Sequence, residues 1–173
     1  MAVGNLEFIK SASGSSVTTL DVTNCFTSKY DVYVFSIDKV DAQAGGYFNL
    51  RFLDSGGTVI SASEYDYANL IMLAYSSFVE NKATADTGIE RIMRKSATSE
   101  ENGGGYHYVF NPNDSSSYTF YLGQSGGSVI SGSGLVGLKS IGVHKSAEQI
   151  TGFQLYGATF DTLEVSVYGL ASN

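Results

Sequence analysis

The sequence predicts an all-β protein built as a two-sheet antiparallel sandwich or jelly roll. The 173 residues include 12 Tyr, 10 Phe and 20 Gly, but one Pro and no Trp, and only 16% of them are charged. Such a composition suits strands and turns better than helices. Roughly eight to ten short runs of strand-like pattern, separated by turn residues, point the same way. A chain of this length fits one domain, which we expect to span residues 1–173.

The last stretch of the chain, residues 149–170, carries the clearest alternation. Two runs of alternating apolar and polar residues flank a short break at residues 158–161, and Gly157 and Gly169 close the two runs. Such a break is short enough for a tight antiparallel connection, and glycine suits a bend or bulge at each end. We therefore expect two half-buried strands that end the chain in a hairpin. Their apolar side carries Phe153, Leu155, Leu163, Val165 and Val167.

Two further features come from the N-terminal part of the chain. Residues 6–9 and 17–22 lie on either side of a Ser/Gly-rich segment at 11–16, and a turn of this composition between two short strands predicts a hairpin. Residues 30–37 are apolar on both sides. This pattern is typical of a strand in the middle of a sheet that is covered on both faces.

A second hairpin is predicted around residues 54–57. The run at 47–52 alternates cleanly and is followed by Asp-Ser-Gly-Gly, which leads into a run at 58–62. Because glycine takes the positive φ that tight turns need, this sequence between two alternating runs is a good hairpin signal.

A third hairpin is predicted around residues 111–114. This segment reads Asn-Pro-Asn-Asp, in which proline presets φ and the Asn or Asp side chains cap the turn. It separates alternating runs at 106–110 and 118–122. After a Gly/Ser-rich stretch at 123–134, residues 135–143 supply one more strand before the final pair.

Residues 65–78 fit two structures. Their apolar residues fall at helical spacing, which would give an amphipathic helix of about 14 residues. The polar segment at 81–87 and the Ser, Glu and Gly-rich segment at 97–105 favour extended chain and loop instead. Residues 89–94 fit a strand or a helical turn, so the pattern alone leaves both structures open.

Two short strings match functional motifs, but neither has the required context. Residues 123–127 match G-x-S-x-G around Ser125, yet a nucleophile elbow lies between a strand and a helix, and here more Ser and Gly follow. Residues 132–137 match G-x-G-x-x-G, but the next residues have the β-branched content of a strand, so no helix N-terminus is available for a pyrophosphate. We predict flexible glycines here, with no catalytic serine and no nucleotide cofactor.

Metal and acid–base sites are not indicated either. The two histidines, His107 and His144, fall in separate predicted strands without Cys or His at ligand spacing, so each is interpreted as a strand-surface or satisfied core residue. Three local carboxylate pairs could contribute to a calcium site or a glycosidase dyad, but solvated loop charges explain them more simply. We therefore predict no catalytic residues, no metal and no cofactor. The pairs are Asp38 with Asp41, Glu64 with Asp66, and Glu100 with Glu101.

The net charge and the single cysteine limit which binding partners and disulfide bonds are expected. The formal net charge of −7 opposes binding to a phosphate backbone or an anionic membrane surface, so neither nucleic acid nor membrane is expected. The one cysteine, Cys25, cannot form an internal disulfide and is interpreted as a small core residue. The first residues lack the basic flank and apolar run of a secretory signal, and no window approaches roughly 18 apolar residues. We expect the chain to be made and kept soluble.

Several segments carry a resemblance through their order along the chain. They read SKYDVYVFSI at 28–37, FNLRF at 48–52 with DSGG at 54–57, SEYDY at 63–67, FNP at 110–112, ITGFQLY at 150–156 and LEVSVYG at 163–169. In this order, over residues 11–170, the sequence resembles virion structural proteins of marine tailed bacteriophages, a group that includes capsid decoration (knob) proteins.

The resemblance implies a jelly-roll fold, no catalysis and a place on the phage particle, which is assembled in the cytoplasm of the host bacterium. The implied partners are the major capsid protein, copies of this chain, or both. It further implies that the run after residues 63–67 is an extended strand, that 81–87 is a surface loop, and that 89–94 is a strand.

One segment departs from the family pattern, because residues 69–78 are more apolar than a free loop would be. Exposed apolar patches usually mark an interface. We therefore predict that this segment lies at a subunit contact, with 81–87 and 97–104 on the solvent side; the alternative is that it lines the domain's own core. The candidate interface residues are Leu70, Ile71, Met72, Leu73, Tyr75 and Phe78.

Two candidate functions follow from the predicted fold and the resemblance. The first is a capsid decoration protein on the outer surface of the phage head. The second is a lectin-like or receptor-binding module of a fibre or tail that binds host surface glycans, since jelly rolls host both. The absence of Trp disfavours stacking on sugars, although 12 tyrosines could substitute.

Overall fold

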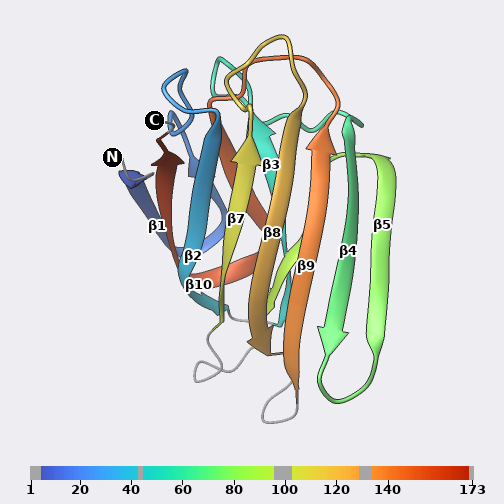
Figure 1. Ribbon diagram of the computed structural model, residues 1–173. Coiled ribbons are helices and arrows are strands. Elements are labelled where there is room, and N and C mark those ends of the chain that lie inside the picture. The colour runs from blue at the N-terminus through green and yellow to red at the C-terminus, as the bar shows by residue number, and fades with distance from the viewer. Residues whose placement is uncertain (1–4, 43–44, 96–102, 129–133, 172–173) are drawn as a thin grey trace.

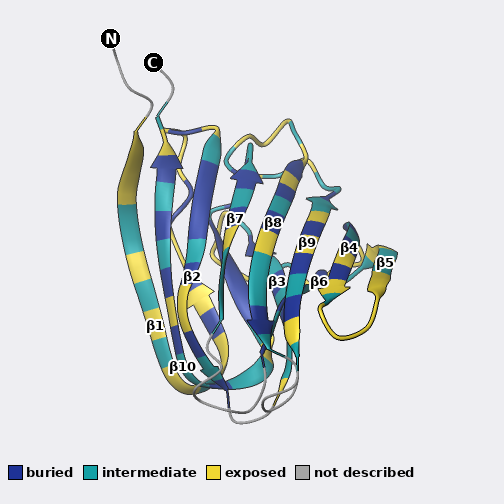
Figure 2. Ribbon diagram, turned by 60° about the horizontal axis from the view of Figure 1, so that its bottom comes forward, coloured by how far each residue is buried: buried dark blue, intermediate teal, exposed yellow. Residues whose placement is uncertain are grey.

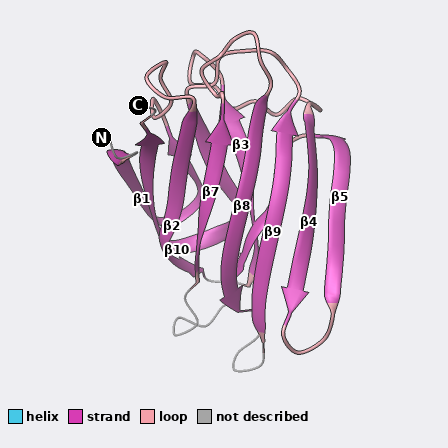
Figure 3. Cartoon of the chain, viewed as in Figure 1, coloured by secondary structure: helices cyan, strands magenta, loops and turns pink. Residues whose placement is uncertain are grey.

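The computed structural model describes residues 5–42, 45–95, 103–128 and 134–171 (Figure 1). Within these ranges the chain forms ten strands and every pairing between them is antiparallel, so the predicted all-β class is confirmed (Figure 3). The strands are β1 (Leu6–Val22), β2 (Val32–Ala42), β3 (Gly46–Leu53), β4 (Tyr65–Leu73), β5 (Phe78–Asp86), β6 (Ile89–Lys95), β7 (Gly104–Phe110), β8 (Thr119–Ser128), β9 (Leu135–His144) and β10 (Gly152–Leu170). In the described ranges no helix is long and apolar enough to cross a membrane.

The strands form one sheet that rolls back on itself. Its order is β5-β4-β9-β8-β7-β2-β10-β3-β6, and β1 pairs with β10 beside this path. The far end of the sheet folds behind its first part, so that β6 packs against β8, β9 and β4 (Figures 1 and 2). The result is a nearly closed, barrel-like shape with the core between the two layers.

β10 is the strand that makes the roll possible. Its first part pairs with β3, with Phe153 opposite Phe52, and its second part pairs with β2, with Val165 opposite Ile37. Gly157 lies between the two parts with φ of 105°. The predicted C-terminal hairpin is therefore wrong, because residues 158–161 continue a bent strand that changes partner and do not reverse the chain.

β1 follows the same bend, so the predicted N-terminal hairpin is also wrong. Residues 11–15 are extended and pair with the second part of β10. The ladder is irregular between Val17 and Thr19, beside Ser16 with φ of 53°. A Ser/Gly-rich segment has few bulky side chains that favour a strand by themselves. Here it is extended because it pairs with β10, which lies far away in the sequence.

The middle of the chain is extended. Residues 65–73 and 78–86 are β4 and β5, so the helical alternative and the predicted surface loop at 81–87 are both wrong. The apolar residues of β4 also fit a period of two, since Tyr65, Tyr67 and Ile71 all point inward. The strand expected at 89–94 is confirmed as β6.

Most other predicted elements are present. The central strand is β2, which lies between β7 and β10. Gly57 takes φ of 79° and donates to the Asp54 carbonyl at 3.0 Å, although the run at 58–62 is reduced to one bridge from Val59 to Leu53. At the other turn, the Asp114 amide donates to the Asn111 carbonyl at 3.3 Å.

The Gly/Ser-rich residues 123–128 continue β8, where a connecting stretch was predicted. Residues 96–102 and 129–133, which cover most of the predicted loop at 97–105 and the rest of that stretch, lie outside the described ranges.

The core is aromatic where β2 and β10 meet. Phe35 stacks on Phe153 with ring centroids 4.3 Å apart, and Phe26 packs edge-on against Tyr33 at 4.8 Å. Cys25 is buried beside them, as predicted, and burial raises the pKa of its thiol to about 12. A reactive thiolate is therefore not expected at this position.

Candidate functional site

The side of the β5-β4-β9-β8-β7 layer that faces away from the core is called the outer face here. Strand alternation places every second side chain on it. One row runs across the layer through Ala68, Ile141, Leu122 and Tyr108, which are direct cross-strand neighbours. Along β8 and β9, Figure 2 shows exposed and partly exposed positions interspersed with buried ones.

The outer face is apolar and open to solvent. Among the described residues, several large hydrophobic side chains on it are more than a third exposed, although the exposed Lys139 lies among them, and an apolar patch on a single chain usually marks a binding surface. The exposed fractions are 39% for Leu70, 37% for Met72, 47% for Phe120, 55% for Ile141 and 67% for Leu135.

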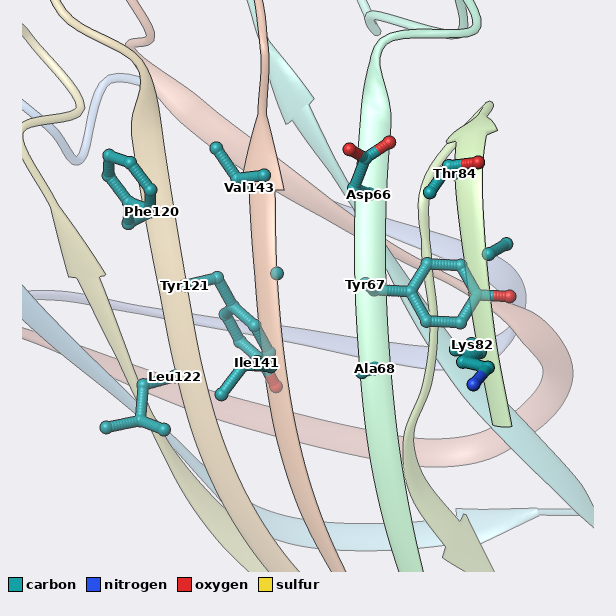
Figure 4. A pocket seen from close by; sticks show the side chains of 12 residues that line it. Asp66, Tyr67, Ala68, Lys82, Thr84, Phe120, Tyr121, Leu122, Ile141 and Val143 are labelled. Atoms are coloured by element: carbon teal, nitrogen blue, oxygen red, sulfur yellow. The ribbon is translucent and has the colours of Figure 1, made fainter. Parts of the chain in front are cut away.

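The upper part of the outer face is hollowed into a groove of about 820 Å³ across β8, β9, β4 and β5. In Figure 4 Phe120 and Ile141 lie on the β8 and β9 side, and Asp66 and Thr84 lie on the β4 and β5 side. Asp66 is already engaged, because Lys145 Nζ lies 2.7 Å from its Oδ1 and holds the pKa of the carboxyl below its usual range. The groove thus has an apolar wall and a polar rim, on which Asp66 is paired with Lys145 and Lys82 has no ion pair among the described residues.

The lower part of the outer face is a furrow over three aligned glycines. Gly104, Gly126 and Gly137 are cross-strand neighbours on β7, β8 and β9, so no side chain covers the sheet there. Hollows of about 510 and 390 Å³ lie over this row, and Met72 lines both. The sequence shows these glycines, but only the register shows that they line up.

The predicted interface segment is divided by strand alternation. Leu70 and Met72 belong to the outer face, and Tyr75 and Phe78, at the β4–β5 turn, are 51% and 74% exposed. Ile71 points inward into a small cluster with Val136 and Leu138, against which Leu73 packs. Four of the six candidate residues are therefore available to a partner and two belong to the domain's own packing; contact with a partner stays a prediction.

His107 is a core residue, one of the two positions predicted for it, but its Nε2 has no hydrogen-bond partner among the described residues. Its Nδ1 lies 2.7 Å from the hydroxyl of Tyr121, and its ring stacks on Phe35 at 4.6 Å. Burial lowers its pKa from 6.5 to about 3, so the imidazole is neutral at ordinary pH. Sealed from solvent in this way, it has no access to a substrate.

His144 lies in the one group of potential metal ligands that converges in the described ranges. Its Nε2 is 3.2 Å from Glu64 and 3.6 Å from Glu148, and the ligand atoms of all three lie within 4.8 Å of one another. The imidazole is fully buried and the carboxylates are partly exposed. One nitrogen and two oxygens could hold a divalent cation, but the hydrogen bond between His144 and Glu64, with the Glu148 carboxylate close by, explains the same geometry. The sequence hid this group because Glu64 is 80 residues from His144.

The motif strings fall on strands. Ser125 is in β8, and its Oγ donates to the carbonyl of Ile92 at 2.8 Å, so it has no elbow geometry. The glycine string at 132–137 leads into β9 and not into a helix. Of the acidic pairs, Asp38 accepts from Ser36 and Ser166, and Asp41 pairs with the buried Lys95 at 3.0 Å. Residues 100 and 101 lie outside the described ranges.

Comparison with known proteins adds little to this geometry. No family model and no curated protein matches the chain. Among solved structures, it has a distant likeness to the marine PL-14 alginate lyase from Aplysia kurodai, with 6% identity, coverage of 90% of this chain and 82% of the lyase chain, and a TM-score of 0.26. A likeness at this level carries no argument about activity.

Proposed function

We propose that the protein is a non-catalytic structural component of a bacteriophage virion, a capsid decoration protein that docks on the shell of the head through its outer face. The observation that supports this is the group of exposed apolar side chains Leu70, Ile141 and Phe120, which lie on one face of three neighbouring strands. Burial of such side chains stabilises a contact by about 25 cal/mol per Å² of apolar surface removed from water. The resemblance in the sequence supplies the choice of a phage head.

The proposal includes the jelly-roll type for the rolled sheet. β1 and β10 both pass from one layer to the other, which is compatible with a jelly roll as well as with a distorted barrel. The buried histidine and the serine bound to a backbone carbonyl give no support to catalysis, so docking is the simpler proposal.

A second candidate function rests on the groove. Its volume of about 820 Å³ is within the usual size for a small-molecule site, and its apolar wall faces Asp66, Lys82 and Thr84. A lectin-like module would use such a surface for one or two sugar rings. The groove has no Trp to stack on a sugar, which places this function second.

The test uses the purified protein and phage particles that lack it. Ile141→Asp places a charge at the centre of the outer face without touching the core, and we expect it to reduce co-sedimentation with the particles at least tenfold. Tyr118→Asp is the matched control, because Tyr118 is 46% exposed but lies in the turn before β8. This control should bind as the parent does.

The outcomes separate the two functions. Equal co-sedimentation of Ile141→Asp and the parent would reject docking through the outer face. A glycan array provides the other arm, and specific glycan binding that Ile141→Asp abolishes, without particle binding by the parent, would favour the lectin-like module.

A further inference from the structure

Among the described strands, β5 has the free edge that is best suited to pairing with another chain. It pairs with β4 on one side only and stands at the open end of the sheet, as Figures 1 and 2 show. β1 also has a free side, but it is bent and its ladder has two register shifts. β6 ends the other side of the order and is covered by β8 and β9.

Exposed edge strands are usually protected by proline, charge or bulges. β5 contains no proline, and its charges before the final Asp86 are Glu80 and Lys82. Both are exposed, both lie on the outer face, opposite Leu70 and Ala68 of β4, and neither forms an ion pair within the described ranges. A lone lysine on an edge strand disfavours pairing with another chain. When two copies pair antiparallel, however, a Glu and a Lys two residues apart can each face the opposite charge on the other copy.

The register of such a pair follows from the charges. With Asn81 opposite Asn81 of a second copy, Glu80 of each copy faces Lys82 of the other. A shift of two residues one way puts Glu80 opposite Glu80, and the same shift the other way puts Lys82 opposite Lys82. Opposite charges stabilise directly facing positions and like charges destabilise them, so only the first register is favoured.

The backbone geometry of β5 restricts pairing between two copies to the same part of the strand. Asn81 lies within residues 78–83, which pair regularly with β4; beyond them the ladder shifts register between Tyr65 and Tyr67, and Ala85 takes φ of 55°. The regular part of the edge therefore contains the residue that the charges select.

We infer that two copies of this chain pair through β5, antiparallel and centred on Asn81, with Glu80 of each copy opposite Lys82 of the other. The two sheets then form one continuous sheet, and because facing residues share a side, the two outer faces join into one surface. This pairing does not depend on the proposed function, since it uses the strand edge and not the apolar face.

Sedimentation velocity over a concentration series tests the inference with the full chain. The parent should show a monomer–dimer equilibrium. Glu80→Lys and Lys82→Glu each turn two attractive pairs into two repulsive ones, so each should raise the dimer dissociation constant roughly tenfold. The double variant Glu80→Lys with Lys82→Glu restores the pairs and should dimerise within about twofold of the parent.

Lys139→Glu is the matched control for net charge, because Lys139 is exposed on β9 away from the edge. It should leave dimerisation unchanged, as should Ile141→Asp. A parent that stays monomeric, single variants that dimerise like the parent, or a double variant that fails to recover would each overturn the pairing. Hydrogen exchange gives a second measure, since amides of residues 78–84 should gain protection with concentration while those of β9 do not.

Discussion

His107 shows how one buried side chain ties stability to pH. It is fully buried between Phe35 and Tyr121, and burial lowers its pKa from 6.5 to about 3. In the unfolded chain the imidazole regains its ordinary pKa and binds a proton below pH 6.5, whereas the folded protein does not. Stability is therefore fully present above pH 6.5 and is lost as the pH falls toward 3.

The expected loss from this residue is about 2 kcal/mol between pH 7 and pH 5, since one proton costs about 1.4 kcal/mol per pH unit. His107→Gln keeps a polar partner for Tyr121 but cannot titrate, so its free energy of unfolding should fall less over the same range. Urea unfolding at the two pH values measures both. Parallel pH dependence of the parent and the variant would contradict the burial argument.

Val165 tests the prediction that alternate residues of the C-terminal stretch face the core. It is fully buried in the core, opposite Ile37 of β2. Val165→Asp puts an unpaired carboxylate there and should cost roughly 3–5 kcal/mol, a large part of the total stability of a domain. Leu170→Asp is the control from the same strand, because Leu170 is 38% exposed and should tolerate the charge. Equal melting temperatures for the two variants would reject the assigned faces.

At the scale of the element, the bend of β10 depends on one glycine. Gly157 has φ of 105°, and a Cβ added there would lie 2.7 Å from the Asn49 amide nitrogen. Gly157→Ala should therefore destabilise the fold by about 1–3 kcal/mol. Gly126→Ala is the matched control, since its Cβ meets open space on the outer face and should change stability by less than about 0.5 kcal/mol. Thermal unfolding of the two variants decides whether the bend needs glycine.

Individual strands were predictable because alternation is local. The runs that became β3, β7, β8 and β10 could be assigned from period-two patterning, and β2 from a run that is apolar on both sides. The bends in β1 and β10 were read as hairpins, since a glycine or a serine-rich segment that bends a strand has the same local sequence as one that reverses it. Only the partner strands distinguish the two, and they lie far away in sequence.

The candidate surface was harder to predict for the same reason. Leu70 and Met72 could be singled out as apolar residues in an apolar segment, but Phe120 and Ile141 join them only through the register of β8, β9 and β4. The glycine furrow and the group around His144 also cannot be predicted without that register. The residues of β5 looked like a polar loop, because an exposed edge strand carries few apolar residues.

At the scale of the whole molecule, the two proposed surfaces are separate. Docking uses the outer face, and self-pairing uses the edge of β5 that borders it. Ile141→Asp and Glu80→Lys should thus each weaken one interaction and spare the other, and a cross-test of both variants in both assays checks this independence. Loss of both interactions in either variant would mean that one surface serves both.

The ladder between β1 and β10 joins the two ends of the chain, from Leu6 opposite Leu170 to Val22 opposite Phe153. During synthesis β1 emerges before β10, and it stays unpaired until β10 has also left the ribosome. Closing so long a loop costs entropy before any contact repays it, and folds dominated by such distant pairs form slowly. The Ser-rich, weakly apolar character of β1 then has a kinetic advantage, because a strand that must wait unpaired is safest when it has little tendency to aggregate.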